Sequence, residues 1–372
     1  MKAVFHRVAI FGVGLIGGSL GMAIKKHGLA EQVIGFDIDQ ANLQLAVELQ
    51  AIDQGFVQVE PEQLSEADLV VLAAPITVNL NILKSIKAYL KPEVIITDVG
   101  STKADFVKAC EELLTEEHHF VGGHPMAGAE VAGVQGADPY LFENAIYILT
   151  PTERTKQHVT IKLQYFFEKI GARVMLIDPI EHDLLVASIS HLPHLIASTL
   201  VNTVASMEED HPLALVLAAG GFRDTTRIAS GDPSLWKDIC FSNREQLLKM
   251  IQLFKEQLLT LEKQLAASER DEFEASLAKA QKTRAKIPAK MKGYWPFLDE
   301  IIVTIPDRPG TIGQVAAILG EQGINIDDIE ILRVREGEGG SLRLGFATMG
   351  AADKAIEILA KHDLVARKRL GS

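Results

Sequence analysis

The sequence predicts three consecutive regions of different fold class: an α/β region with a parallel sheet, an all-α region and a small α+β region. Over residues 1–178, short apolar runs alternate with helical periodicity, which is typical of βαβ units. Residues 179–292 show helical periodicity without further strand patterns. Strand and helix patterns return over residues 298–372. We expect these three ranges to be separate domains.

Length and composition narrow the class of protein. A chain of 372 residues suggests two or three domains, and a net charge of −12 argues against a nucleic-acid partner. The two cysteines, Cys110 and Cys240, do not make a disulfide framework and fit a reducing compartment. We find no uninterrupted apolar run long enough to span a membrane and no room for a signal peptide before the first strand. We therefore expect a cytoplasmic protein.

A glycine-rich turn follows the first buried strand, which we place at residues 8–11. Its glycines lie at G-x-G-x-x-G spacing: Gly12, Gly14 and Gly17. The first glycine allows the turn, the second lets backbone approach a pyrophosphate, and the third lets the helix pack closely on the strand. The N–H groups of the helix that begins near Leu15 and Ile16 would hold the diphosphate. This pattern predicts a dinucleotide-binding domain of the Rossmann type.

The next strand, residues 33–37, indicates which dinucleotide binds. It ends in Asp37, twenty residues after Gly17. A carboxylate at this place accepts hydrogen bonds from a ribose 2′-hydroxyl and repels a 2′-phosphate. The sequence therefore favours NAD over NADP as cofactor.

Polar residues follow the later strands, where the ligands of parallel sheets collect. The turn after the strand at residues 94–98 contains Ser101, which either caps the next helix or places its hydroxyl beside a nicotinamide. The following strand ends in a stretch of glycines and a proline around His124. A histidine there could accept a hydroxyl proton while hydride leaves the same carbon, because its ordinary pKa is near neutrality. A structural histidine is the alternative.

The helical region carries an apolar stripe. Helical patterns cover residues 181–190, 193–205 and 243–283, and in the last of these the apolar residues recur at three- and four-residue spacing: Leu247, Met250, Ile251, Phe254, Leu258, Leu261 and Leu265. Such a stripe packs against other helices. We expect it to form a homodimer interface, with packing inside one chain as the alternative.

Two polar motifs interrupt this region. The first contains His191 and His194, but no carboxylate or cysteine lies at ligand spacing, so we expect no metal site. The second contains Arg223, Asp224 and Arg227. Asp224 lies three residues before Arg227 and could orient its guanidinium to bind a carboxylate; a simple surface ion pair is the alternative.

Five motifs together resemble the prephenate dehydrogenase family of tyrosine biosynthesis, over residues 5 to about 285. They occur in the family's order at residues 12–19, 98–103, 123–128, 191–194 and 221–229. The resemblance implies that NAD oxidises prephenate with loss of CO2 to give 4-hydroxyphenylpyruvate and NADH. It also implies that His124 accepts a hydrogen bond from the ring 4-hydroxyl, and that Ser101 assists it and positions the nicotinamide.

The same resemblance implies how the substrate is held. His194 and Arg227 would help to bind prephenate, and Glu130 would lie at the mouth of the site. Because prephenate carries two carboxylates, Arg223 is a second candidate for a cationic anchor. The residues leave open which carboxylate Arg227 holds.

The last region follows a basic linker that ends at residue 292. Its elements follow βαββαβ order, which is ferredoxin-like: strand 300–305, helix 311–322, strand 324–334, strand 341–347, helix 351–362 and strand 364–368. Residues 307–310 and 323–326 resemble the ACT domain, a module that binds amino acids. The resemblance implies tyrosine or phenylalanine as regulatory ligand, near Asp307, Gly310 and Asn325. An inert dimerisation module is the alternative.

Three other functions stay open at this point. Arogenate dehydrogenase differs from the leading hypothesis only in an amino group in place of a keto group on the substrate. The β-hydroxyacid dehydrogenases also join a dinucleotide domain to helices, but they rely on a catalytic lysine where this chain offers arginines. A sensor that responds to NAD or to amino acids is the alternative without catalysis, and the presence of His124, Ser101 and Arg227 argues against it.

Overall fold

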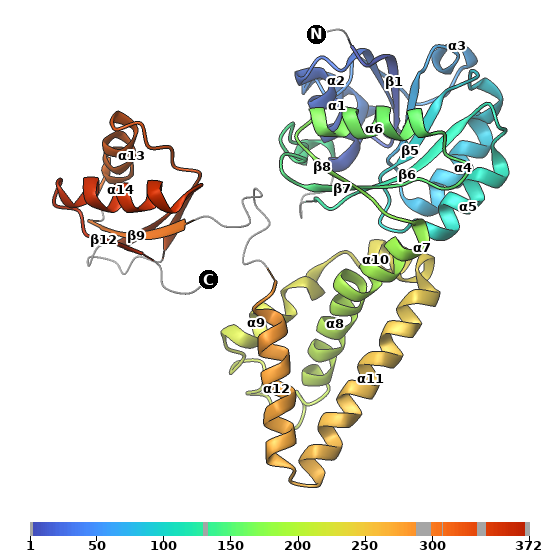
Figure 1. Cartoon of the computed structure of the whole chain (residues 1–372). Helices are drawn as coiled ribbons and strands as arrows, with labels where there is room; N and C mark the ends of the chain where they lie inside the picture. Colours follow the sequence, from blue (N-terminus) through green and yellow to red (C-terminus); the bar gives the residue numbers. More distant parts are fainter. Residues whose placement is uncertain (1–2, 129–132, 288–298, 307, 333–339, 369–372) are drawn as a thin grey trace. The chain divides into compact units, whose positions relative to one another are not determined.

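The chain divides into two compact units, residues 1–287 and 288–372, which are described separately below (Figure 1). The computed structural model describes residues 3–128, 133–287, 299–306, 308–332 and 340–368. The first unit contains the α/β region and the helical region. The second contains the small α+β region.

An eight-stranded sheet forms the α/β region. Its strand order is β3-β2-β1-β4-β5-β6-β7-β8, and its strands are β1 Phe5–Phe11, β2 Ala30–Phe36, β3 Gln54–Phe56, β4 Leu69–Leu72, β5 Ile95–Asp98, β6 His119–Pro125, β7 Ile146–Thr150 and β8 Arg173–Leu176. The sheet is parallel except that β6 and β7 pair antiparallel, which differs from the all-parallel arrangement we expected. The described part of the β6–β7 connection holds only the 3₁₀ turn Val134–Gly136. A parallel pairing there would need a crossover helix.

Helices pack on both faces of this sheet: α1 Leu15–Lys26, α2 Gln40–Glu48, α3 Pro61–Leu64, α4 Ile76–Ile86, α5 Ala104–Leu113 and α6 Gln157–Lys169. Strand β1 shows why both faces are apolar. Val8 and Ile10 belong to one buried cluster, whereas Ala9 and Phe11 belong to the other. Since alternate side chains point to opposite faces, a strand covered on both sides reads as a continuous apolar run.

The helical region begins with a continuous helix from Pro179 to Ala205. It comprises α7 Pro179–Val186, a π-helical turn at Ala187–His191 and α8 Leu192–Ala205. By length and composition this helix could cross a membrane, although our search of the sequence for an uninterrupted apolar run predicted no such segment. This helix nevertheless buries polar side chains against the rest of the protein, among them His182, Asp183 and His194.

The remaining helices of this region are α9 Gly220–Thr226, α10 Pro233–Ser242, α11 Arg244–Ala266 and α12 Arg270–Arg284, with a 3₁₀ turn at Arg227–Ser230. The helical stretch predicted over residues 243–283 is thus two helices, α11 and α12, which form a hairpin (Figure 1). The break follows from Ser268, whose φ of 56° is left-handed and incompatible with a continuing helix.

The start of α5 is capped from the helical region. The backbone N–H groups of Lys103 and Ala104 donate to the two carboxylate oxygens of Asp183, at 2.7 and 2.8 Å. The hydroxyl of Thr102 donates instead to Ser242 Oγ, at 2.9 Å. The capping interpretation of the Ser101 turn is therefore wrong, because the cap comes from α7.

The second unit is a four-stranded antiparallel sheet with two helices, in the order β10-β11-β9-β12. Its elements are β9 Asp299–Ile305, α13 Thr311–Glu321, β10 Asp328–Leu332, β11 Gly340–Phe346, α14 Met349–Ala360 and β12 Ala366–Lys368. The predicted βαββαβ order is confirmed. Strand and helix side chains such as Val303, Leu344, Val315 and Leu359 form its core.

A buried ion pair generates a stability prediction for the first unit. Lys103 and Asp98 are both fully buried; the ammonium of Lys103 donates to the Asp98 carboxylate and to the carbonyl of Gly123, at 2.8 Å. Removal of one partner leaves a buried charge without compensation, so Lys103→Met should lower the free energy of unfolding by about 3–5 kcal/mol. Urea unfolding followed by circular dichroism measures this loss.

The matched control is Lys108→Met, on the exposed side of α5. It should change the free energy of unfolding by less than about 0.5 kcal/mol. A Lys103→Met variant as stable as this control would show that the ion pair does not hold the β5 and β6 ends together.

Candidate active site

The glycine-rich turn leaves open space in front of α1. Gly12 has a φ of 89°, and a Cβ on Gly17 would lie 2.1 Å from the carbonyl oxygen of Gly12. A Cβ on Gly14 would have no atom within 4 Å. The first turn of α1, at Leu15 and Ile16, has neither a side-chain cap nor an acidic residue. Its N–H groups and the positive end of the helix dipole therefore suit a diphosphate.

Asp37 lies beside this turn, directly after β2. Its Oδ2 accepts hydrogen bonds from the backbone N–H of Val13, at 3.0 Å, and from Asn42 Nδ2, at 3.2 Å, and its Oδ1 accepts from the backbone N–H of Asp39, at 3.1 Å. The half-buried carboxylate is thus held in one orientation next to the glycines. The arrangement fits a ribose of NAD.

His124 is at the carboxyl end of β6, and its neighbours come from α7. Its Nδ1 is 2.8 Å from Nε2 of His182, and Nδ1 of His182 is 2.8 Å from Oδ1 of Asp183. Burial, and after it the charges of His182, Lys103 and His191, hold the pKa of His124 well below its usual value. The imidazole is therefore neutral at pH 7, as a proton acceptor must be.

Ser101 is half-buried in the turn between β5 and α5. Two hydrogen bonds tie the β5 end to the strand that carries His124: the backbone N–H of Gly123 donates to Asp98, at 3.1 Å, and Lys103 Nζ donates to the Gly123 carbonyl. Since β5 and β6 are parallel neighbours, Ser101 and His124 follow the same edge of the sheet.

His194 is buried on α8 and stacks on Trp236, with 3.6 Å between ring centroids. Its Nδ1 has no hydrogen-bond partner within the described part of the chain. Burial lowers the pKa of His194, and a hydrogen bond with the backbone of Ile228 opposes this shift. The other histidine of this motif, His191, instead has its Nδ1 3.2 Å from Asn243 Nδ2.

The two predicted arginines belong to exposed segments that lie next to His194. Arg223 is on α9 and Arg227 begins the 3₁₀ turn that follows it; both side chains are exposed. This turn packs against α8, and its Ile228 is the residue that hydrogen-bonds His194. The structure thus brings the Arg227 turn and His194 together. Glu130 lies outside the described residues.

Possible metal ligands gather elsewhere. Among the described residues, one group of three has donor atoms within 4.8 Å of one another: Glu93, His119 and His158. His119 begins β6, so this group is at the opposite end of the strand from His124. Neither His191 nor His194 takes part in it.

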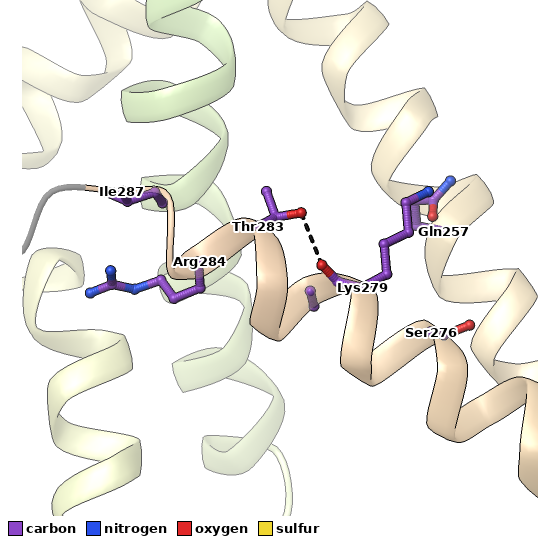
Figure 2. A pocket seen from close by; sticks show the side chains of 7 residues that line it. Gln257, Ser276, Lys279, Thr283, Arg284 and Ile287 are labelled. Atoms are coloured by element: carbon purple, nitrogen blue, oxygen red, sulfur yellow. Dashed lines mark hydrogen bonds between the residues drawn. The ribbon is translucent and has the colours of Figure 1, made fainter. Parts of the chain in front are cut away.

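A hollow lies between α11 and α12, and Figure 2 shows the residues that line it. They are Gln257, Ser276, Lys279, Ala280, Thr283, Arg284 and Ile287. The hydroxyl of Thr283 donates to the carbonyl of Lys279 within α12. None of the predicted site residues lines this hollow.

The residues predicted to bind a regulatory ligand belong to the second unit. Gly310 has a φ of 89° and precedes α13, and Asn325 Nδ2 donates to Asp327 Oδ1, at 2.7 Å. Gly310 is in a turn, and Asn325 lies in the connection between α13 and β10. Asp307 lies outside the described residues.

Sequence reasoning missed two members of the site, His182 and Asp183. They are adjacent on α7 and both buried, but the printed sequence shows only a polar pair in an amphipathic helix. Their contacts with residues 58 and 80 positions away come from tertiary structure, and no local spacing signals them.

Three sequence profiles match the chain in succession. The prephenate dehydrogenase nucleotide-binding domain matches residues 20–176, the prephenate dehydrogenase dimerization domain matches residues 178–279, and the ACT domain matches residues 300–355. The two units of the structure contain these three matches in that order.

Relatives of this chain carry related names. A prephenate dehydrogenase of Bacillus subtilis (strain 168) is 36% identical over 98% of this chain and 99% of its own length. A cyclohexadienyl dehydrogenase of Zymomonas mobilis is 33% identical over 76% of this chain and 96% of its own.

Solved structures agree with these relatives. The prephenate dehydrogenase of Aquifex aeolicus, crystallised with hydroxyphenyl propionate and NAD+, has a TM-score of 0.70 and 33% identity over 76% of this chain and 98% of its own. Arogenate dehydrogenase of Synechocystis has a TM-score of 0.68 and 33% identity over 75% of this chain and 99% of its own. The predicted fold class, enzyme class and NAD cofactor are confirmed. The chain belongs to the prephenate dehydrogenase family of NAD-dependent oxidoreductases and carries an ACT domain.

Proposed function

We propose that the chain is a prephenate dehydrogenase, which converts prephenate and NAD to 4-hydroxyphenylpyruvate, CO2 and NADH. The observation that carries the proposal is the buried, neutral imidazole of His124 at the same edge of the sheet as the open glycine turn. The relatives that extend through the ACT region, from Bacillus subtilis and Lactococcus lactis, are both named prephenate dehydrogenases. Arogenate is the alternative substrate, because arogenate dehydrogenase of Synechocystis has a similar fold.

The cofactor site would be formed by the glycine turn and Asp37. Bound NAD supplies the hydride acceptor for the reaction. Gly14 leaves room for a diphosphate, which the first N–H groups of α1 would bind, and Asp37 would accept hydrogen bonds from the ribose hydroxyls. Ser101 positions the nicotinamide from the turn after β5.

The chain's main chemical contribution is a proton acceptor in a fixed place. His124 accepts the hydrogen bond of the 4-hydroxyl as the ring carbon that bears it loses hydride, and so stabilises the positive charge that develops on the oxygen. The bond between the ring and its carboxylate then breaks, its electron pair makes the ring aromatic, and CO2 leaves. The proton that His124 draws from the hydroxyl returns to the phenolic oxygen of the product. Positioning and proton withdrawal are sufficient, because aromatisation supplies the driving force.

Substrate binding is assigned to the turn that packs on α8. Arg227 offers a planar fork that can hold a carboxylate with two hydrogen bonds, and Arg223 is a second cation on the preceding helix. His194 supplies a ring nitrogen that no described residue satisfies. Glu130 is proposed to lie at the mouth of the site.

Exposed apolar side chains on α11 support a homodimer. They are Leu248, Leu253, Phe254, Leu258, Leu259 and Leu265, and they belong to the region that matches a dimerization domain. An exposed apolar face of this kind indicates a protein–protein contact. Of the predicted stripe, Phe254, Leu258 and Leu265 are exposed, whereas Leu247 is buried within the chain.

Regulation and location complete the proposal. We assign the ACT domain to feedback control by tyrosine or phenylalanine, bound near residues Asp307, Gly310 and Asn325. We place the enzyme in the cytoplasm, because both cysteines are free thiols and the longest apolar helix buries charged and polar side chains within the protein.

Formation of NADH at 340 nm tests the function. The full chain should oxidise prephenate with NAD at least about tenfold more efficiently, in kcat/KM, than arogenate with NAD or prephenate with NADP, a preference of roughly 1.4 kcal/mol or more. Added tyrosine or phenylalanine should lower the rate. A preference for arogenate would instead identify the enzyme as an arogenate dehydrogenase. An absence of turnover with either substrate would favour a sensor without catalysis.

His124→Asn tests the proton acceptor. The variant should lose about 10²–10⁴-fold in kcat, the range of general acid–base catalysis, while the Kd for NAD stays unchanged because the glycine turn is intact. Steady-state kinetics and a calorimetric NAD titration measure the two quantities. Near-normal turnover would remove His124 from the mechanism.

Arg227→Ala tests the anchor of the substrate. Loss of one charged hydrogen-bond donor costs about 1.5–3 kcal/mol, so the KM for prephenate should rise by roughly 10- to 100-fold with a smaller effect on kcat. Arg270→Ala, an exposed arginine at the start of α12, is the control. If Arg227→Ala lowers only the melting temperature, the structural ion-pair interpretation is correct.

A further inference from the structure

We propose that His182 and Asp183 are positioning residues that hold His124 in one tautomer, with its proton on Nδ1 and its Nε2 free to accept the substrate's hydroxyl proton. The inference rests on the proposed function of His124. It assigns a role in the reaction to two residues of α7 that do not themselves touch the substrate.

The three side chains form a continuous hydrogen-bonded row. His124 Nδ1 is 2.8 Å from His182 Nε2, and His182 Nδ1 is 2.8 Å from Asp183 Oδ1. His182 is completely buried, and Asp183 and His124 are only 2% and 9% exposed. Water therefore does not compete for these bonds, and three ring nitrogens, His124 Nδ1 and both nitrogens of His182, find their partners inside the row.

Asp183 determines in which direction the hydrogen bonds of the row are donated. Its Oδ1 accepts the backbone N–H of Lys103, at 2.7 Å, and its Oδ2 accepts that of Ala104, at 2.8 Å. These two groups are the free donors at the start of α5, where the helix dipole favours a negative charge. The carboxylate is thus oriented by donors on α5 and acts as an acceptor toward His182.

The proton positions follow from this acceptor. His182 donates from Nδ1 to Asp183, so the neutral ring has only a lone pair on Nε2. His124 must then donate from Nδ1 to that lone pair. Because a neutral imidazole carries one N–H, the Nε2 of His124 is left as an acceptor. The opposite tautomer of His124 would present an N–H to the substrate hydroxyl and could not withdraw its proton.

The surroundings favour a neutral ring at His124. The groups that act on His124 from the packed elements are the ammonium of Lys103, before α5, and the imidazoles of His182 and His191, on the helix that contains α7. The ammonium of Lys103 is itself bound to Asp98 and to the Gly123 carbonyl. A positive charge on His124 would therefore be buried near the ammonium of Lys103.

Two substitutions at His182 separate positioning from packing. His182→Asn can keep the contact with Asp183 but leaves His124 Nδ1 without an acceptor. His182→Gln reaches the position of Nε2, and with its amide nitrogen toward Asp183 it presents a carbonyl oxygen to His124. We expect His182→Asn to lose about 10²-fold in kcat, with the KM for prephenate within about twofold of the wild type and a large part of the loss recovered in His182→Gln.

The tautomer itself is measured independently of activity. In the ¹⁵N-histidine-labelled full chain, a neutral ring gives distinct signals for its protonated and unprotonated nitrogens, and the His124→Asn variant identifies the signals of His124. We expect Nδ1 to be protonated and Nε2 to be unprotonated in the wild type. In His182→Asn this distribution should shift toward the other tautomer.

A matched control comes from the same strand. His119 is also buried and also contacts a carboxylate, Glu93, at 2.9 Å, but at the opposite end of β6. His119→Asn should leave kcat within about twofold of the wild type, so any general effect of removing a buried imidazole appears there as well.

The outcomes are distinguishable. A His124 protonated on Nε2 in the wild type, or equal losses of kcat in His182→Asn and His182→Gln, would overturn the positioning role. If the wild type does not oxidise prephenate, the proposed function fails, while the nitrogen spectra still decide the tautomer.

Discussion

The rest of the site depends on the hydrogen bonds that the carboxylate of Asp183 accepts. This carboxylate receives the backbone N–H groups of Lys103 and Ala104 at the start of α5 and contacts His182 on its own helix. One buried group thereby satisfies the first turn of α5, joins the helical region to the sheet and orients the row of imidazoles. Its loss would leave buried donors without partners, which costs more than the bonds themselves contribute.

The remaining parts of the site meet because parallel strands place their carboxyl ends at one edge. The glycine turn follows β1, the Ser101 turn follows β5, and His124 ends β6. The buried Asp98–Lys103 pair joins the β5 and β6 ends, since both residues also bond the backbone of Gly123. The proposed substrate anchor Arg227 comes from the 3₁₀ turn that packs on α8.

The sequence predicted the features that rest on local spacing. Gly12 and Gly17 are required by a positive φ and by a close backbone approach, and the βαββαβ order of the second unit follows from periodicity. The antiparallel β6–β7 pair and the role of Asp183 could not be predicted in this way. The first depends on how an irregular connection runs, and the second joins residues about 80 positions apart. The capping alternative for Ser101 was wrong for the same reason, because a distant carboxylate took the place of a local side chain.

A double-mutant cycle between Asp183→Asn and His124→Asn tests most directly whether Asp183 acts through His124. We would measure kcat with prephenate for the wild type, both single variants and the double variant. The account predicts that Asp183→Asn lowers kcat strongly in the wild type and adds almost nothing once His124 is replaced, because residues that act as a unit are not additive. Losses that multiply in the double variant would contradict it and would restrict Asp183 to a structural role.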